Sequence, residues 1–311
     1  MTGRVVALSG GVGGAKLALG LARVLGEDEL VVVANTGDDF VHLGLAISPD
    51  VDTLLYTLAG LADPVRGWGL RDETWTFMAA LERLGGDTWF RLGDADLAMH
   101  VERTRRLAAG ATLTEVTDAL RRRLDIGARV LPMSDDPVRT RLRTDAGWLD
   151  FQDYFVRHRC EPVIREIAFE GARVAAASPA VLEALRDPAL RAVVVCPSNP
   201  LLSVGPMLAI RALRAALIDS PAPVVAVSPV IAGAAVKGPT AKLLRELGHE
   251  SSAAAVARAY RDFVDVFVAD EADVATAVPP GMRLVTAPAL MASLEDRERL
   301  ARAVLAAADA R

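Results

Sequence analysis

The sequence contains little cysteine and little lysine, and each shortage narrows the range of functions. Its 311 residues include two cysteines, Cys160 and Cys196, which lie far apart and follow no pairing pattern. We therefore expect neither a disulfide framework nor a zinc site, and a reducing cytoplasm fits this use of cysteine. Of 35 basic residues only three are lysines, Lys16, Lys237 and Lys242. The first two follow glycine or other small residues, which marks them as candidate anion ligands.

Other absences concern membranes and nucleic acids. No apolar run is long enough to span a bilayer, and the chain enters a strand almost at once, without a charged and apolar leader. The net charge is −5, and acidic and basic residues are interspersed. This balance gives no argument for a nucleic-acid or anionic-membrane partner. Because 52% of the residues are hydrophobic, a sizeable core is available. We expect a cytoplasmic protein that binds small molecules.

A glycine-rich loop follows the first apolar run, in the order Gly10-Gly11-Val12-Gly13-Gly14-Ala15-Lys16. The run before it predicts a buried strand, and apolar residues over 17–25 recur at helical spacing. The free N–H groups at such a helix start favour an anion, typically phosphate. The loop lacks the Gly-Lys-Ser/Thr of a Walker motif and the third glycine of a dinucleotide motif. The glycines either serve packing alone or hold a phosphate-containing ligand, and their density favours the ligand.

Polar residues gather where the predicted strands end. A second buried strand, over 30–34, runs into Asn35-Thr36-Gly37-Asp38-Asp39, and Asp50 and Asp52 precede the next apolar helix. In an open parallel sheet these ends lie side by side, so the aspartates should approach the glycine loop. Simple turns and helix caps are the alternative reading. Carboxylates beside a phosphate are unfavourable unless a hard cation lies between them, which points to Mg²⁺.

The remaining sequence predicts one α/β domain over residues 1–311. Further strands are expected near 128–132, 192–196, 224–228, 263–269 and 282–286. Two more polar turns follow Leu131 and Cys196. We predict a Rossmann-like, doubly wound, mostly parallel sheet whose core comprises about 1–60 and 190–311. A largely helical insertion is expected over about 61–189, with a hairpin around Asp145-Ala146-Gly147.

In combination, these motifs resemble the CofD family. The segments that carry the resemblance are Gly10–Leu17, Asn35–Asp39, Pro49–Thr53, Arg91–Asp96, Leu131–Pro137, Phe151–Phe155, Pro197–Pro200 and Val236–Thr240. They cover nearly the whole chain in the family's order. The resemblance implies a 2-phospho-L-lactate transferase of coenzyme F420 biosynthesis. Such an enzyme transfers a phospholactyl group from lactyl-2-diphospho-5′-guanosine, or its enolpyruvyl analogue, to the 5-deazariboflavin Fo. GMP leaves, (dehydro) coenzyme F420-0 forms, and the family's metal is magnesium.

The resemblance also implies roles for individual residues. Asp38, Asp39 and Asp50 are the catalytic candidates, which would hold magnesium or orient the acceptor hydroxyl, with Asp38 and Asp50 as the candidate metal ligands. Asp50 and Arg91 would contact the deazaflavin, although many relatives have lysine at position 91. Donor and phosphate ligands are expected at Gly10, Gly11, Gly13, Gly14, Lys16, Ser198, Asn199 and Lys237. A homodimer is expected for a soluble enzyme of this kind.

Two other functions are weighed against the transferase. A nicotinamide-dependent oxidoreductase would place an acidic residue at the end of the second strand, where Asn35 stands. A non-catalytic nucleotide-sugar-binding regulator of the gluconeogenesis-factor-like family would share the glycine loop. It would lack the segments 91–94 and 151–155, so their presence favours the transferase. The choice among lactyl, enolpyruvyl and glyceryl donors stays open at this stage.

Overall fold

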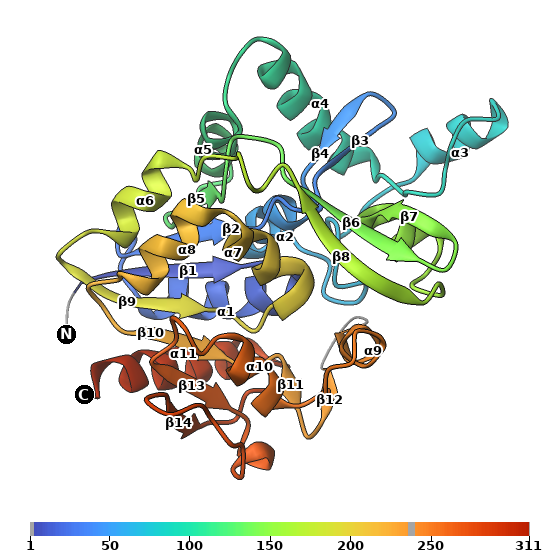
Figure 1. Cartoon of the computed structure of the whole chain (residues 1–311). Coiled ribbons are helices and arrows are strands. Elements are labelled where there is room, and N and C mark those ends of the chain that lie inside the picture. Colours follow the sequence, from blue (N-terminus) through green and yellow to red (C-terminus); the bar gives the residue numbers. More distant parts are fainter. Residues whose placement is uncertain (1–2, 236–239, 311) are drawn as a thin grey trace.

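A computed structural model describes residues 3–235 and 240–310 and has a parallel sheet at its centre (Figure 1). The seven strands of this sheet pair in parallel in the order β14-β13-β10-β9-β1-β2-β5. They are β1 (Arg4–Ser9), β2 (Leu30–Ala34), β5 (Arg129–Pro132), β9 (Leu190–Val195), β10 (Val224–Val227), β13 (Val266–Ala269) and β14 (Arg283–Thr286). The predicted Rossmann-like α/β fold is confirmed.

Helices cover both faces of the sheet, because successive side chains of a buried strand point to opposite faces. Val5 and Ala7 of β1 pack in one apolar cluster, with α1, α2, α5 and α11. Val6 and Leu8 pack in the other, with α6, α8 and α10. The bounds are α1 (Gly11–Val24), α2 (Pro49–Leu58), α5 (Leu113–Arg123), α6 (Pro179–Leu185), α8 (Arg211–Ile218), α10 (Ala253–Ala259) and α11 (Leu294–Asp309).

The direction in which strands are added reverses at β1. The chain adds β2 and β5 on one side of β1, and then β9, β10, β13 and β14 on the other. Leu8 of β1 is in register with Val195 of β9, so the two strands end together. A crevice beyond the carboxyl ends of these two strands is the usual ligand position of a doubly wound sheet. The fold therefore places the candidate site where the glycine loop leaves β1.

The segment 61–189 differs from the largely helical insertion that the sequence predicted. Its strand β5 belongs to the main sheet, beside β2. The hairpin predicted around Asp145–Gly147 is confirmed, and it joins β8 in a three-stranded antiparallel sheet. Along β6 the arginines 139, 141 and 143 alternate with buried side chains, which is strand periodicity. The bounds are β6 (Arg139–Thr144), β7 (Gly147–Asp150), β8 (Ile164–Glu170), α3 (Thr76–Arg83), α4 (Asp94–Ala108) and the π-helical turn η1 (Asp153–Arg157).

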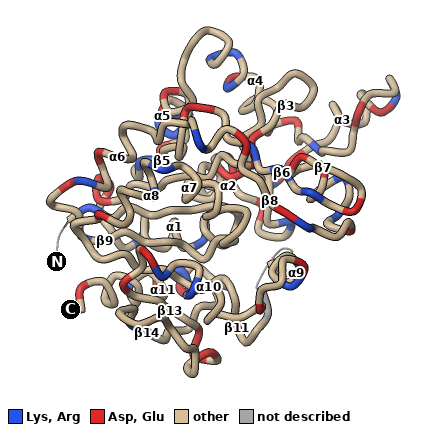
Figure 2. The backbone as a smooth tube through the Cα atoms, in the orientation of Figure 1, with Lys and Arg blue, Asp and Glu red and all other residues tan. Residues whose placement is uncertain are grey.

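Shorter elements surround the carboxyl edge of the main sheet. They are β3 (Phe40–His42), β4 (Leu45–Ile47), η2 (Pro200–Val204), α7 (Gly205–Ala209), β11 (Val230–Ile231), β12 (Ala234–Ala235), α9 (Thr240–Glu246) and the 3₁₀ turn η3 (Glu271–Asp273). Figure 2 shows acidic and basic residues interspersed on the outer elements. Among the described residues no single helix is long and apolar enough to cross a membrane. One bent pair, Pro200–Ala209 with Arg211–Ile218, meets a criterion of length and composition only.

Candidate active site

The glycine loop packs directly against the end of β9. A Cβ on Gly13 would lie 2.6 Å from the Pro197 carbonyl oxygen, and one on Gly14 would lie 2.5 Å from the Ser198 hydroxyl oxygen. The Gly10 amide donates to the Ser198 Oγ at 3.0 Å. Contacts this short exclude any side chain at Gly13 and Gly14, so α1 can begin at the floor of the crevice only with glycine there. Packing accounts for these two glycines.

Gly11 has a different reason to be glycine. Its φ is +66°, and nothing lies within 4 Å of the position that a Cβ would take. The Gly11 amide donates to Asp50 Oδ1 at 2.6 Å. A carboxylate of the protein therefore lies at the N-terminus of α1, where the partial positive charge of a helix attracts an anion. The next two amides of this first turn, those of Val12 and Gly13, precede the first i to i−4 bond of the helix and have no acceptor within it.

Asn35, at the end of β2, joins two of the candidate aspartates. Its amide nitrogen donates to Asp50 Oδ2 at 2.9 Å and to Asp38 Oδ1 at 3.1 Å. Its own oxygen accepts the Gly37 amide at 2.9 Å, which fixes the orientation of the side chain. The structure thus brings Asp38 and Asp50 together, although 12 positions separate them in the sequence.

Asp39 is the third buried carboxylate of the cluster. Its Oδ2 accepts a hydrogen bond from the Ser48 hydroxyl at 2.8 Å. Its Oδ1 is buried and has no partner among the described residues. A buried oxygen without a donor is costly, so this atom is available to a ligand or a proton.

Burial shapes the electrostatics of the three aspartates. Each is at least 92% buried: Asp38 and Asp39 are 8% exposed, and Asp50 is 6% exposed. Burial raises the pKa of Asp39 to about 7 and that of Asp50 to about 6. Burial also raises the pKa of Asp38 well above its usual range, with further contributions from the charges of Asp50 and Asp39. Arg139 offsets part of this effect at Asp38 and Asp39. The cluster holds more negative charge than its protein neighbours neutralise.

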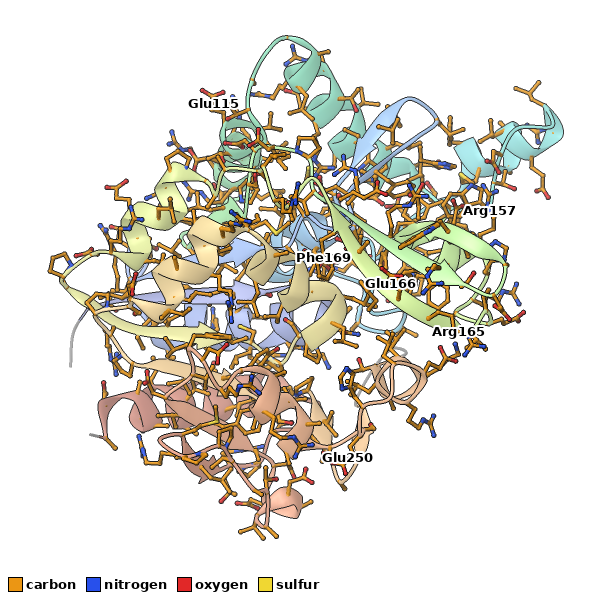
Figure 3. The ribbon with its side chains drawn as sticks, in the orientation of Figure 1. Glu115, Arg157, Arg165, Glu166, Phe169 and Glu250 are labelled. Atoms are coloured by element: carbon orange, nitrogen blue, oxygen red, sulfur yellow. The ribbon has the colours of Figure 1, made fainter. Side chains whose placement is uncertain are left out.

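A cavity of about 530 Å³ opens beside Asp38 and Asp39. Its wall combines flat rings with arginines from the β3–β4 hairpin, the segment 87–89, β6 and η1. The lining includes Phe40, His42, Trp89, Phe151, Arg139, Arg141 and Arg157. The Arg157 guanidinium lies 4.5 Å from the Trp89 ring centroid and 3.3 Å from Asp87 Oδ2, on the side of the molecule near β7 (Figure 3). The cavity suits a flat aromatic ligand that also carries polar groups.

Three other predicted site residues have different surroundings. The Lys16 ammonium donates to the Met291 carbonyl oxygen at 2.8 Å. Arg91 is exposed, and its guanidinium lies 4.2 Å from the Trp75 ring centroid. The Asn199 oxygen caps η2 by accepting the amides of the two residues after Pro200. Lys237 lies outside the described residues.

Sequence reasoning missed three residues that shape the cluster. Asn35 belongs to the polar turn that the sequence places beside the glycine loop, but no role of its own was predicted for it. Sequence patterns gave no reason to select Arg139 or Trp89. Both line the cavity because segments far apart in the sequence meet there. No local sequence pattern predicts which of these distant segments lie side by side.

Comparison with known proteins decides the family. The family model described as 2-phospho-L-lactate transferase CofD matches residues 5–300. The chain belongs to the CofD family. The chain is 42% identical to a phosphoenolpyruvate transferase of Kitasatospora aureofaciens, over 98% of both chains. It is 40% identical to a 2-phospho-L-lactate transferase of Methanosarcina mazei, over 97% of this chain and 100% of that protein.

Similarity to solved structures supports the fold of this CofD-family protein. A crystal structure of a UPF0052-family protein from Bacillus halodurans superposes with a TM-score of 0.64. The match covers 98% of this chain and 99% of the other at 14% sequence identity, so it bears on the fold alone. The sequence relatives are named as transferases, and the comparisons give no support to a non-catalytic regulator.

Proposed function

We propose that this protein transfers a phospholactyl or phosphoenolpyruvyl group from a guanosine diphosphate-linked donor to the deazaflavin Fo, with release of GMP. The observation that carries the proposal is the carboxylate cluster at the crevice between β1 and β9, in a chain of the CofD family. The ribityl hydroxyl oxygen of Fo forms a bond to the distal phosphorus of the donor diphosphate. The bond from that phosphorus to the bridging oxygen breaks, and GMP leaves with the oxygen.

The donor phosphates would bind at the first turn of α1. The amides of Val12 and Gly13 have no acceptor within the helix, and Ser198 lies at the same crevice floor. We place the guanosine side at Ser198 and Asn199, beyond the end of β9. The Lys16 ammonium already donates to the Met291 carbonyl oxygen, and its remaining donors are candidates for a phosphate beside the loop amides. Lys237 stays a candidate on the grounds of the sequence motif alone.

The acceptor would occupy the 530 Å³ cavity. Its fused rings would stack among Phe40, Trp89 and Phe151, and its ribityl chain would extend toward the aspartates. We assign Asp39 as the base, because the residue lines this cavity and its Oδ1, which has no partner among the described residues, can take the proton of the attacking hydroxyl. Arg91 would contact the deazaflavin from the Trp75 side.

The residues of the cluster fit a magnesium ion. The partnerless Asp39 oxygen and the raised pKa values of Asp38 and Asp50 mark a site with excess negative charge. Within the described ranges no three His, Cys, Asp or Glu side chains form a ready metal site. Mg²⁺ needs only one or two carboxylates when substrate phosphates complete its shell, and we propose Asp38 and Asp50. When bound, the ion supplies charge neutralisation at the diphosphate.

The carboxylic-acid portion of the donor, the location and the assembly state complete the proposal. Relatives named for phosphoenolpyruvate and for phospholactate are 42% and 40% identical to this chain, so identity does not choose between these donors, nor against a glyceryl donor. We place the enzyme in the cytoplasm, where the free thiols of Cys160 and Cys196 remain reduced. We further propose a homodimer, which a sedimentation measurement would test directly.

A transfer assay tests the function. The protein is incubated with Fo, Mg²⁺ and each guanylylated donor in turn, and GMP and the deazaflavin product are followed by mass. We expect equal molar amounts of GMP and of a deazaflavin product that carries phospholactate, phosphoenolpyruvate or phosphoglycerate. No GMP from any donor, with saturable binding of a nucleotide sugar by folded protein, would support the regulator instead.

A further inference from the structure

Helix α4 contributes a fully buried arginine to the core beneath the site. Arg103 is 0% exposed and is among the largest side chains that the described chain buries completely. A charged side chain is almost never buried to this extent unless it is paired. Its partner is Asp52 of α2: both terminal guanidinium nitrogens donate to the two carboxylate oxygens, with Nη1 at 3.1 Å from Oδ2. The two planar groups thus meet in a bidentate pair, which fixes orientation as well as distance.

Asp52 lies in the first turn of the helix that carries Asp50 into the site. The Asp52 amide donates to the Ser48 carbonyl oxygen at 2.9 Å, and Asp50 stands one residue after Pro49, at the start of the same turn. Any rotation of this turn moves the Asp50 carboxylate relative to the Gly11 amide. Ser48, which precedes the helix, also donates to Asp39. The ion pair that fixes Asp52 therefore also restrains the backbone that positions Asp50 and the hydroxyl that binds Asp39.

Helix α4 makes further contacts on either side of this pair. Arg103 Nη1 donates to the Ala46 carbonyl oxygen at 3.3 Å, and the Ala46 amide donates to the Thr104 hydroxyl at 2.8 Å. Ala46 belongs to the hairpin whose other strand lines the cavity. On the other side, the Tyr56 hydroxyl of α2 donates to Asp96 of α4. Helix α4 thus holds both α2 and the hairpin through polar groups.

Apolar packing restrains the hairpin and α4 only weakly, whereas Val51 and Leu54 of α2 also pack in the cluster on the main sheet. The cluster beneath the hairpin has three buried members, Ile47, Met78 and Leu92. By contrast, the two clusters that flank the main sheet contain most of the buried apolar side chains of the fold. A small apolar cluster tolerates sliding of a helix by fractions of an ångström more readily than a hydrogen-bonded fork does.

We propose that Arg103 is a positioning residue for the transfer reaction: through Asp52 it fixes the first turn of α2 and so holds Asp50 against the N-terminus of α1. The proposal rests on the proposed function for its kinetic consequences, whereas the placement of Asp50 can be measured without any turnover. The proposal also gives a role to the segment 61–189, because α4 belongs to that segment and contacts α2 through Arg103. Arg103 itself does not touch a substrate.

A purely stabilising role makes a different prediction. Replacement of a buried ion pair by apolar residues of similar volume is often neutral or stabilising, because the desolvation cost disappears with the charges. The double variant Asp52→Leu/Arg103→Met should therefore fold. If the pair only stabilises the chain, this variant keeps its kcat. If the pair positions Asp50, kcat falls although stability is retained.

The experiment compares the double variant with wild type and with Arg105→Met. Arg105 lies on the same helix but is exposed and paired with Glu102, so its loss controls for a missing arginine on α4. For the double variant we expect kcat to fall roughly 10- to 100-fold, the effect of an ångström-scale misplacement, with little change in the KM for Fo. We also expect faster hydrogen exchange at the Gly11 amide, which Asp50 now protects. Wild-type kcat together with wild-type Gly11 exchange would overturn the proposal.

A conservative variant keeps the test decisive if the double variant fails to fold. Arg103→Lys retains the positive charge but cannot form the fork, so it should fold and lose kcat by several-fold. A lysine variant with wild-type kcat and wild-type Gly11 exchange would also refute positioning. If the wild-type protein itself releases no GMP, the proposed function fails, while Gly11 exchange in the variants still decides whether Arg103 holds Asp50.

Discussion

The substitution Asp39→Asn should make the protein more stable and at the same time inactive. Asp39 is 8% exposed, and an asparagine of the same shape can still accept the Ser48 hydrogen bond. The substitution removes the free-energy cost of ionising a buried carboxyl group. The same change removes the atom that we assign to accept the proton of the acceptor hydroxyl.

The pKa of Asp39 gives the size of the expected gain. Burial raises it from 3.8 to about 7 in the folded chain. The folded state therefore holds this proton more tightly than the unfolded state, so the stability from protonation is full below pH 4 and is lost as the pH rises through about 7. A rise of about three pH units corresponds to roughly 4 kcal/mol. Relative to wild type, the asparagine variant should thus gain about 1.5 kcal/mol at pH 5 and about 4 kcal/mol at pH 8.

Urea unfolding with a chelator present, at pH 5 and at pH 8, measures both values. The exposed Asp28→Asn serves as the matched control and should change the free energy of unfolding little at either pH. In the transfer assay the Asp39 variant should lose at least about 100-fold in kcat, the typical contribution of a general base. An identical gain in stability at both pH values would refute the argument, because the gain would then not come from the ionisation of Asp39.

Four further outcomes are expected. Asp50→Asn should fold, since an amide oxygen can still accept the Gly11 hydrogen bond, and should release no GMP; normal turnover would remove Asp50 from the site. Gly13→Ala should lower the free energy of unfolding by about 1–3 kcal/mol, because its Cβ would lie 2.6 Å from the Pro197 oxygen; in Gly127→Ala the nearest atom, the Cγ of Glu27, would be 3.2 Å away, so this control should cost less. Trp89→Leu should raise the KM for Fo and leave the KM for the donor unchanged; equal effects on both would contradict the placement of the acceptor. Mg²⁺ should raise the melting temperature more at pH 8 than at pH 5, because the buried aspartates are ionised only at the higher pH; a rise independent of pH would argue against these ligands.

The sequence predicted the part of the site that is built from strand ends. The apolar runs before Gly10 and Asn35 identify buried parallel strands, and the switch-point rule then brings the two turns together. The structure confirms this meeting, since Asp50 bonds to both the Gly11 amide and Asn35. The local sequence pattern was sufficient to predict this contact because the strand ends of a parallel sheet lie side by side in a regular way.

Other parts of the site depend on contacts that no local pattern encodes. Arg103 lies in a helix with two other arginines, Arg105 and Arg106, neither of which is buried, and only the approach of Asp52 distinguishes it from them. The alternation along β6 was visible in the sequence, but its placement against Asp38 and Asp39 was not. Likewise, the cavity forms from segments that tertiary packing alone brings together.

The long separation between β1 and β9 has a consequence for folding during synthesis. Gly10 and Ser198, which share a hydrogen bond at the crevice floor, are 188 positions apart in the sequence. At ribosomal speed, roughly 10–40 s pass between the synthesis of the two. During that time one edge of β1 has no partner, although β2 can already pair with the other. An unpaired apolar edge is a template for wrong pairing, so the nascent chain should depend on chaperones until β9 emerges from the ribosome.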